Sequence, residues 1–304
     1  MKKILFSGLL LLAFTCVWSQ QLPQYSQYIL NKYVINPASA GSENYFVGQT
    51  NYRSQWEGIK DAPRTYILGV NGPIANQKMG IGGYMFADVT GPTQRNGVSF
   101  SYAYHLNLTS NLKLSMAINA GILQYTVDGT EIIFENSNDD VFSSAKEDNV
   151  LPDAGFSFYL YAPNYFFGAS APQLIQNQLD FKKSVRDPSG RLTNHYFITG
   201  GYTYDLNSAF QIEPSFLLKY VDPIPLQYEF TLRGLYRESY WVGASYRKSD
   251  AIGILVGFTL QSNLSFGYSY DIIQSDIQNY STGTHEIVLS IKFNNKGTTS
   301  SSSE

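Results

Sequence analysis

Hydrophobic and polar residues alternate along most of the chain from residue 45 onward. Between Leu112 and Ala120, for example, leucine, methionine and isoleucine alternate with lysine, serine, alanine and asparagine. The same period of two runs through residues 94–107, 263–271 and 283–293. Successive side chains of a β-strand point to opposite faces, so this period predicts strands with one apolar and one polar face.

The alternating region divides into fourteen segments at turn-forming residues. The predicted strands span residues 45–57, 64–72, 79–86, 94–107, 111–126, 153–161, 163–170, 195–206, 208–220, 225–237, 239–248, 250–261, 263–271 and 283–293. Bacterial single-chain barrels have an even number of strands. The segment lengths bracket the roughly 9–11 residues with which a tilted strand crosses a membrane. The sequence therefore predicts an all-β fold, a transmembrane antiparallel β-barrel of about 14 strands in a bacterial outer membrane.

Two further patterns favour a barrel over a soluble β-sandwich. The three longest predicted connections, 127–152, 171–194 and 272–282, all follow odd-numbered strands, whereas most connections after even-numbered strands are short. Barrels combine short periplasmic turns with longer external loops, so every long connection falls outside if both termini of the chain are periplasmic. Aromatic residues also gather near strand ends, as at Tyr236, Tyr240 and Trp241, which is typical of the girdles at a membrane boundary.

The start of the chain has the layout of a secretory signal peptide. Lys2 and Lys3 precede an apolar run that ends at Trp18, and Ser19 closes a plausible cleavage tripeptide. The run is shorter than the about 20 residues of a membrane-spanning helix. We expect four parts: a signal peptide at 1–19, a periplasmic or plug segment at 20–44, the barrel at 45–293, and a flexible tail at 294–304.

Composition narrows the possible partners. Leader removal takes Cys16, the only cysteine, so the mature chain is expected to have neither disulfides nor thiolate metal sites. It also takes two of the 21 basic residues, which leaves 19 against 24 acidic residues and a formal charge of −5. Nucleic acid is not an expected partner of a chain without a basic excess.

Charged residues are 15% of the chain, and several fall on the predicted inner face. These inner positions are Lys113, Glu213, Lys219, Glu229, Arg233 and Lys292. Charges are costly against lipid, so they are expected to line water or to pair across the lumen. This suits an open pore or a closed barrel with a salt-bridged interior.

The search for catalytic and metal-binding groups gives little. Of the positions two residues from His105, His195 and His285, only Thr193 carries a hydroxyl, and it falls in a predicted loop. We therefore expect no enzyme and no cofactor, and a lumenal hydrolase is the weakest alternative. Carboxylates at 138–140 and 147–149 could attract Ca²⁺, but they lack the spacing of a calcium loop and are interpreted as a solvated external loop. The glycines at 80, 82 and 83 lie in a strand pattern, where they ease close packing or a bend.

Three motifs in the first third of the mature chain carry a family resemblance. They are Gln24-Tyr25-Ser26-Gln27-Tyr28, then Asn36-Pro37-Ala38, then Tyr52-Arg53-Ser54-Gln55-Trp56, followed by Gly58 and Ala62-Pro63. In order and spacing they resemble the opening of the PorP/SprF family of type IX secretion system outer-membrane proteins. The barrel pattern extends the resemblance over essentially the whole mature chain.

The resemblance implies a non-enzymatic role in protein secretion of the Bacteroidota type and, in gliding members, export or anchoring of surface adhesins. Implied partners are outer-membrane lipid, other secretion components including a periplasmic scaffold, and cargo with a C-terminal secretion domain. The residues hypothesised to bind partners are Gln24, Tyr25, Gln27, Tyr28, Asn36, Pro37, Arg53 and Trp56.

The segment 21–42 leaves two alternatives open. It could fold against the periplasmic mouth or into the lumen and help to dock partners, or it could be a local cap that only closes the barrel. A rival function is transport of small hydrophobic molecules, as in the FadL family. Those proteins are also fourteen-stranded barrels whose N-terminal plug contains Asn-Pro-Ala, as at 36–38 here. Transport predicts a greasy lumen pocket and a lateral opening, whereas the predicted lumen face is polar and small.

Overall fold

The computed structural model describes residues 22–131, 146–177 and 192–294, which form one closed sheet around an N-terminal segment. The strands are β1 (Phe46–Glu57), β2 (Arg64–Ile74), β3 (Met79–Thr90), β4 (Thr93–Asn107), β5 (Lys113–Asp128), β6 (Lys146–Tyr161), β7 (Tyr165–Ala171), β8 (His195–Tyr202), β9 (Tyr204–Asp205), β10 (Phe210–Val221), β11 (Ile224–Tyr236), β12 (Tyr240–Arg247), β13 (Ala251–Leu260), β14 (Leu264–Ile273) and β15 (Gly283–Phe293). Four short helical turns complete the described structure: α2 (Lys32–Ile35), η1 (Pro37–Ser39), η2 (Gly129–Glu131) and η3 (Asp276–Asn279).

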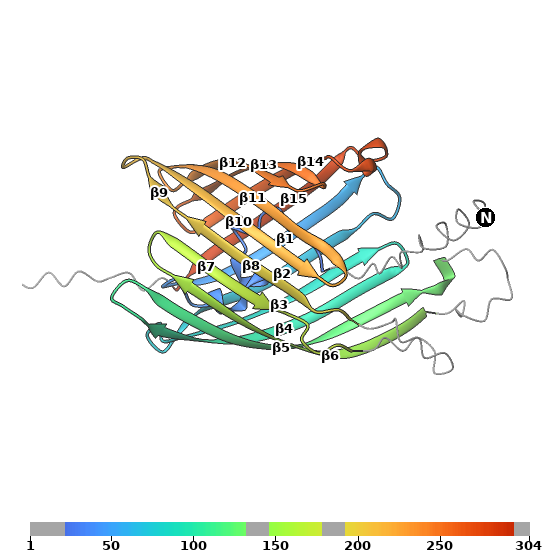
Figure 1. Ribbon diagram of the computed structural model, residues 1–304, viewed down its shortest axis with the longest axis horizontal. Coiled ribbons are helices and arrows are strands. Elements are labelled where there is room, and N and C mark those ends of the chain that lie inside the picture. The colour runs from blue at the N-terminus through green and yellow to red at the C-terminus, as the bar shows by residue number, and fades with distance from the viewer. Residues whose placement is uncertain (1–21, 132–145, 178–191, 295–304) are drawn as a thin grey trace, which may run out of the picture.

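The strands pair antiparallel with their neighbours in the chain, and the pairing of the first strand with the last closes the ring (Figure 1). This pairing of β1 with β15 runs from Phe46 opposite Phe293 to Glu57 opposite Gly283. The segments β8 and β9 are separated only by Thr203 and form one crossing, so the fifteen segments make fourteen strands. The predicted closed, all-β, antiparallel barrel is confirmed.

The two faces of the wall differ as the alternation predicts. In β13, buried and exposed residues alternate from Ala251 to Val256. Large apolar side chains point outward, and Phe100 and Ile118 are 67% and 64% exposed. A band of exposed apolar side chains around the whole ring is unfavourable in water but is what a barrel presents to hydrocarbon. The inward positions are mostly polar and buried, as at Ser157, Ser215 and Ser269.

The ring has two unlike ends. The connections after β2, β4, β6, β9, β11 and β13 are tight turns, and we call this the short-turn end. The connections between β5 and β6, β7 and β8, and β14 and β15 are long and lie at the other, long-loop end, as predicted. The strand β1 begins at the short-turn end, and β15 finishes there.

Three details differ from the sequence-based expectation. The strand β6 begins at Lys146 rather than 153, because it pairs with an extension of β5 up to Asp128. Residues 147–149 therefore lie in a strand and not in a loop, whereas 138–140 lie outside the described residues. Trp241 is predicted to belong to the aromatic girdle, but its side chain is 7% exposed and packs inside against Arg233.

Among the described residues, no helix is long and apolar enough to cross a membrane.

The N-terminal segment Leu22–Gly41, which we call the plug, lies inside the ring (blue in Figure 1). Most of its residues are buried, and Ser26, Ala38 and Ala40 have no exposed surface. Its apolar residues pack against the inner wall, as Tyr28 and Ile35 do against Phe197 and Leu217. Of the two predicted positions, periplasmic or within the barrel, the structure places this segment in the lumen. It includes a single turn of helix, α2, that the sequence pattern did not predict.

Candidate functional site

Ser26 joins the plug to a cluster of buried charges on the wall. Its hydroxyl donates to the Asp271 carboxylate, at 2.6 Å from Oδ2, and accepts from Arg53 Nη1 and Arg247 Nη2, both at 2.9 Å. One hydroxyl hydrogen and two lone pairs are then all used. We call this cluster, with Glu286, the Ser26 clamp.

Glu286 binds the plug backbone as well as the wall. Its carboxylate accepts from the Ser26 and Gln27 amides at 2.8 and 3.2 Å. It also accepts from the Asn51 side chain at 2.8 Å and from Arg53 Nη1 at 2.9 Å. A buried carboxylate is tolerated only when it is paired and hydrogen-bonded, and these four contacts meet that need.

The two guanidiniums of the clamp link its carboxylates into one network. Arg53 bonds to Asp271 at 2.9 Å, and Arg247 lies 3.3 Å from the same carboxylate. Arg247 also pairs with Glu229 at 3.0 Å and with Asp250 at 3.0 Å. The wall residues come from β1, β11, β12, β14 and β15, with Asp250 in the turn after β12. The plug is therefore held against both sides of the seam where the first strand meets the last.

The middle of the plug is held by phenol and amide contacts. The Tyr28 hydroxyl lies 3.2 Å from Ser215 Oγ, and the Tyr33 hydroxyl lies 2.7 Å from Ser101 Oγ. The Gln49 side chain donates to the Leu30 carbonyl at 2.8 Å. These contacts fix the middle of the plug to β1, β4 and β10.

The Asn-Pro-Ala motif at 36–38 lies between the middle of the plug and its last residue, Gly41. Asn36 caps η1 by accepting from the Ala38 amide at 3.0 Å, and its own amide donates to the Phe158 carbonyl at 3.0 Å. Pro37 occupies the first helical position, where its missing N–H costs nothing. The Ser157 hydroxyl also accepts from the Ala38 amide at 3.0 Å, so the motif is fixed to β6.

Glycines let the end of the plug approach the wall at the short-turn end. A Cβ on Gly80 would lie 1.9 Å from the Ala40 carbonyl oxygen, and one on Gly41 would lie 2.7 Å from Gly80 Cα. Gly41 also has φ +75°, a conformation that glycine adopts without strain. His105 Nε2 bonds to the Ala40 carbonyl at 3.0 Å. The predicted use of these strand glycines for close packing is what the plug requires.

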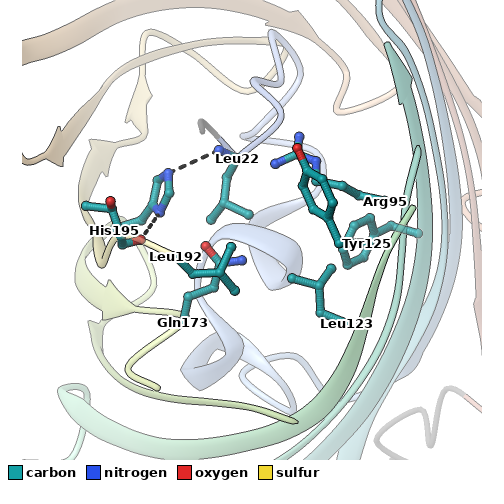
Figure 2. A pocket seen from close by; sticks show the side chains of 9 residues that line it. Leu22, Arg95, Leu123, Tyr125, Gln173, Leu192 and His195 are labelled. Atoms are coloured by element: carbon teal, nitrogen blue, oxygen red, sulfur yellow. Dashed lines mark hydrogen bonds between the residues drawn. The ribbon is translucent and has the colours of Figure 1, made fainter. Parts of the chain in front are cut away.

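The other end of the plug lies near the long-loop end, beside the start of β8 and the end of β10. The Leu22 amide donates to His195 Nε2 at 3.1 Å (Figure 2). Lys219 Nζ donates to the Leu22 carbonyl at 3.0 Å. A cavity of about 10 Å³ remains between Leu22, Leu123, Leu192 and the surrounding side chains, room for about one water molecule. The first described residue of the plug is therefore bonded to both β8 and β10.

A larger cavity, which we call the mouth cavity, opens among the turns of the long-loop end. This mouth cavity has a volume of about 870 Å³. Its lining combines the first plug residues with the turns after β1, β3, β10 and β12. The lining residues used below are Leu22, Pro23, Gln24, Trp56, Lys248 and Asp250.

Trp56 reaches the mouth cavity from an irregular position in β1. The pairing of β1 with β15 shifts between Ser54 and Glu57, and Trp56 has φ 54°. Its amide donates to Thr284 Oγ1 at 3.1 Å. A bulky residue at positive φ is strained, and such strain gathers at functional sites.

The structure separates the eight hypothesised partner-binding residues into two groups. Gln24 and Trp56 line the mouth cavity, where a partner can reach them. The others are buried in the plug and wall: Tyr25, Gln27, Tyr28, Asn36, Pro37 and Arg53. They can meet a partner only if the plug moves, and their observed contacts hold the plug in place.

Sequence reasoning placed most inner charges correctly but missed how they meet. Glu213 pairs with Arg233 inside the barrel, and Lys219 bonds to the plug. The residues Arg247, Asp271 and Glu286 were not singled out. Their positions on the polar face of alternating strands were the available signal.

A closed antiparallel ring with an apolar outer face, a polar inner face and a lumenal plug defines the class of outer-membrane β-barrels. Two solved structures share this fold at 11% identity each. The CymD monoaromatic hydrocarbon channel has a TM-score of 0.53 and covers 89% of this chain and 92% of its own. A Pseudomonas aeruginosa FadL homologue has a TM-score of 0.50, covering 91% and 96%. These likenesses show the fold alone.

The sequence profile described as type IX secretion system membrane protein PorP/SprF matches residues 17–291. The chain therefore belongs to the PorP/SprF family, an outer-membrane β-barrel family of type IX secretion. The expected membership is confirmed. No curated protein matches the chain.

Proposed function

We propose that this protein is a docking component of the type IX machinery, which binds other secretion components and holds exported cargo at the cell surface. The observation that carries the proposal is the mouth cavity with Trp56 at its rim, in a member of a secretion family. If the long-loop end faces outward, as barrel loops usually do, this cavity opens to the cell exterior. We also propose that the signal peptide is removed before the barrel assembles.

The size and lining of the cavity suit a short stretch of polypeptide. Pockets of about 300–1,000 Å³ hold drug-sized ligands, so 870 Å³ accommodates a few side chains but no folded domain. The lining offers the Trp56 ring, the apolar Leu22 and Pro23, and the charges of Lys248 and Asp250. A cargo domain would rest on the rim and insert one segment, with Trp56 as the aromatic anchor.

The plug inside the lumen favours docking over conduction. Its residues are mostly buried against the inner wall, so passage of a polypeptide would require the plug to move. Cargo would therefore be held at the mouth after another component has exported it. A periplasmic scaffold would bind at the short-turn end, where both β1 and β15 have their periplasmic ends.

The rival function is transport of small hydrophobic molecules, which predicts a greasy lumen pocket. The cavity enclosed beside Leu22 holds about one water molecule, and the larger mouth cavity is lined by charged as well as apolar side chains, among them Arg95, Lys248 and Asp250. A groove of about 570 Å³ lies on the outer wall between Tyr66 and Ile122. The ladders from β2 through β5 run across it without a register shift, so it makes no lateral opening. Transport would require the plug to move.

The direct test is to replace Trp56 by alanine in the intact chain. We expect surface-anchored cargo to be lost, because the anchor ring is removed, while the barrel assembles normally. The matched control is Tyr280→Ala, since Tyr280 is an aromatic residue of the long-loop end that is 78% exposed and does not line the cavity. Unchanged cargo anchoring by the Trp56 variant would refute the proposed site.

Deletion of residues 21–36 separates a docking role from that of a local cap. Under the docking proposal, secretion fails even though the barrel is found assembled in the outer membrane, because Leu22–Gln24 form the floor of the mouth cavity. The deletion also opens the lumen, so a conductance should appear in planar bilayers. Intact secretion with normal assembly would dispose of the docking role of this segment.

A further inference from the structure

The plug runs in one direction through the barrel. Its first described residue, Leu22, contacts His195 and Lys219 and lines the mouth cavity at the long-loop end. Its last residue, Gly41, lies against Pro73 and Gly80 near the turn between β2 and β3. That turn belongs to the short-turn end. The plug therefore crosses the lumen from one end of the barrel to the other.

Because the plug crosses the lumen, the chain makes an odd number of passages between the two ends of the barrel. The plug is followed by fourteen strands, so the chain makes fifteen passages between the two ends. An odd number places the beginning of the plug and the end of β15 on opposite sides. With the long loops outside, the plug begins at the exterior and β15 ends in the periplasm.

We propose that the N-terminus of the processed chain lies at the cell-exterior mouth of the barrel. Cleavage after Ser19 leaves two residues before Leu22, too few to return through the barrel.

Cysteine labelling on intact cells tests the position of the N-terminus. The mature chain has no cysteine once Cys16 is removed, so Gln21→Cys provides a single thiol directly before the described plug. The label is a maleimide coupled to a polymer too large for porins. Two turn serines serve as matched controls, because both have positive φ: Ser249→Cys at the long-loop end (φ 56°) and Ser262→Cys at the short-turn end (φ 60°).

We expect Gln21→Cys and Ser249→Cys to react on intact cells to the same extent, and Ser262→Cys to react only after the outer membrane is permeabilised. Reaction of Gln21→Cys only after permeabilisation, together with Ser262→Cys, would overturn the proposed topology. Reaction of Ser262→Cys alone on intact cells would also overturn it, because the barrel would be inverted. A role of the mouth in cargo docking does not enter this test.

Discussion

The two ends of the plug are held by different kinds of contact. Near the long-loop end, Ser26 and Gln27 are bound by charged side chains, among them Asp271 and Glu286. Near the short-turn end, Ala40 and Gly41 are held by close approach to Gly80, where no side chain separates the backbones. One end depends on electrostatics and the other on shape.

This difference indicates which end can change its contacts. Charged groups can exchange one polar partner for another or for water, and Asp250 connects the clamp to the mouth cavity through Arg247. A backbone packed against glycine has no alternative arrangement of similar energy. We therefore expect the clamped end to respond to events at the mouth and the packed end to stay fixed.

The largest effect is expected from Glu286→Ala. It removes the acceptor of the Ser26 and Gln27 amides, of Asn51 and of Arg53. Loss of one partner from a buried ion pair costs about 3–5 kcal/mol. Hydrogen exchange of residues 25–27 should rise sharply, whereas that of residues 36–41 stays as in the parent protein. Glu238→Ala, at an exposed turn, is the control, and equal exchange at both plug ends would contradict the division.

The next effect is expected from Gly80→Ala. The added Cβ would meet the Ala40 carbonyl carbon and oxygen at 2.5 and 1.9 Å, and backbone atoms cannot give way as a side chain can. Overpacking of this kind costs about 1–3 kcal/mol, occasionally more. Urea unfolding in detergent, followed by Trp56 and Trp241 fluorescence, should show the loss. Exchange should rise at residues 36–41 first.

The control for this substitution is Gly234→Ala. The nearest atom to a Cβ at Gly234 is the Val242 carbonyl oxygen at 3.9 Å, which is ordinary contact. Its unfolding midpoint should match that of the parent protein. Equal midpoints for the Gly80 and Gly234 variants would show that the short-turn end is not held by close packing.

The smallest effect is expected from Tyr33→Phe, between the two ends. It removes the hydroxyl that bonds to Ser101 Oγ and leaves the ring in its apolar cluster. One neutral hydrogen bond contributes about 0.5–1.5 kcal/mol. Exchange should rise slightly around residue 33 and at neither end of the plug. A loss as large as that of Glu286→Ala would mean that the plug opens as one unit, without distinct ends.

Much of the wall follows from the sequence, because a strand between lipid and a polar lumen must alternate. The alternation fails as a guide where both faces meet water. The polar run 146–149 reads as a loop but belongs to β6, which pairs there with the end of β5. Trp241 reads as a girdle residue, but its place in the register turns it inward.

The candidate site was less predictable, because its contacts join distant parts of the chain. Ser26 and Glu286 are 260 positions apart, and their meeting depends on the register of the whole closed ring. The sequence pattern places Glu286 on the polar face of a strand and Arg53 in the family motif, but no feature of the sequence around either residue predicts that they pair. The direction of the plug is set by these same long-range contacts.

The bond between Arg53 and Glu286 spans the junction of the oldest and youngest strands to leave the ribosome. A growing or truncated chain that stops before Thr284 still has Asp271 for Arg53 and the Ser26 hydroxyl, but it lacks Glu286, the acceptor of the Ser26 amide. The eleven residues of β15 therefore do more than close the wall, because they also carry Glu286, which binds the first segment of the mature chain. The plug reaches its full set of contacts only when the last strand is in place.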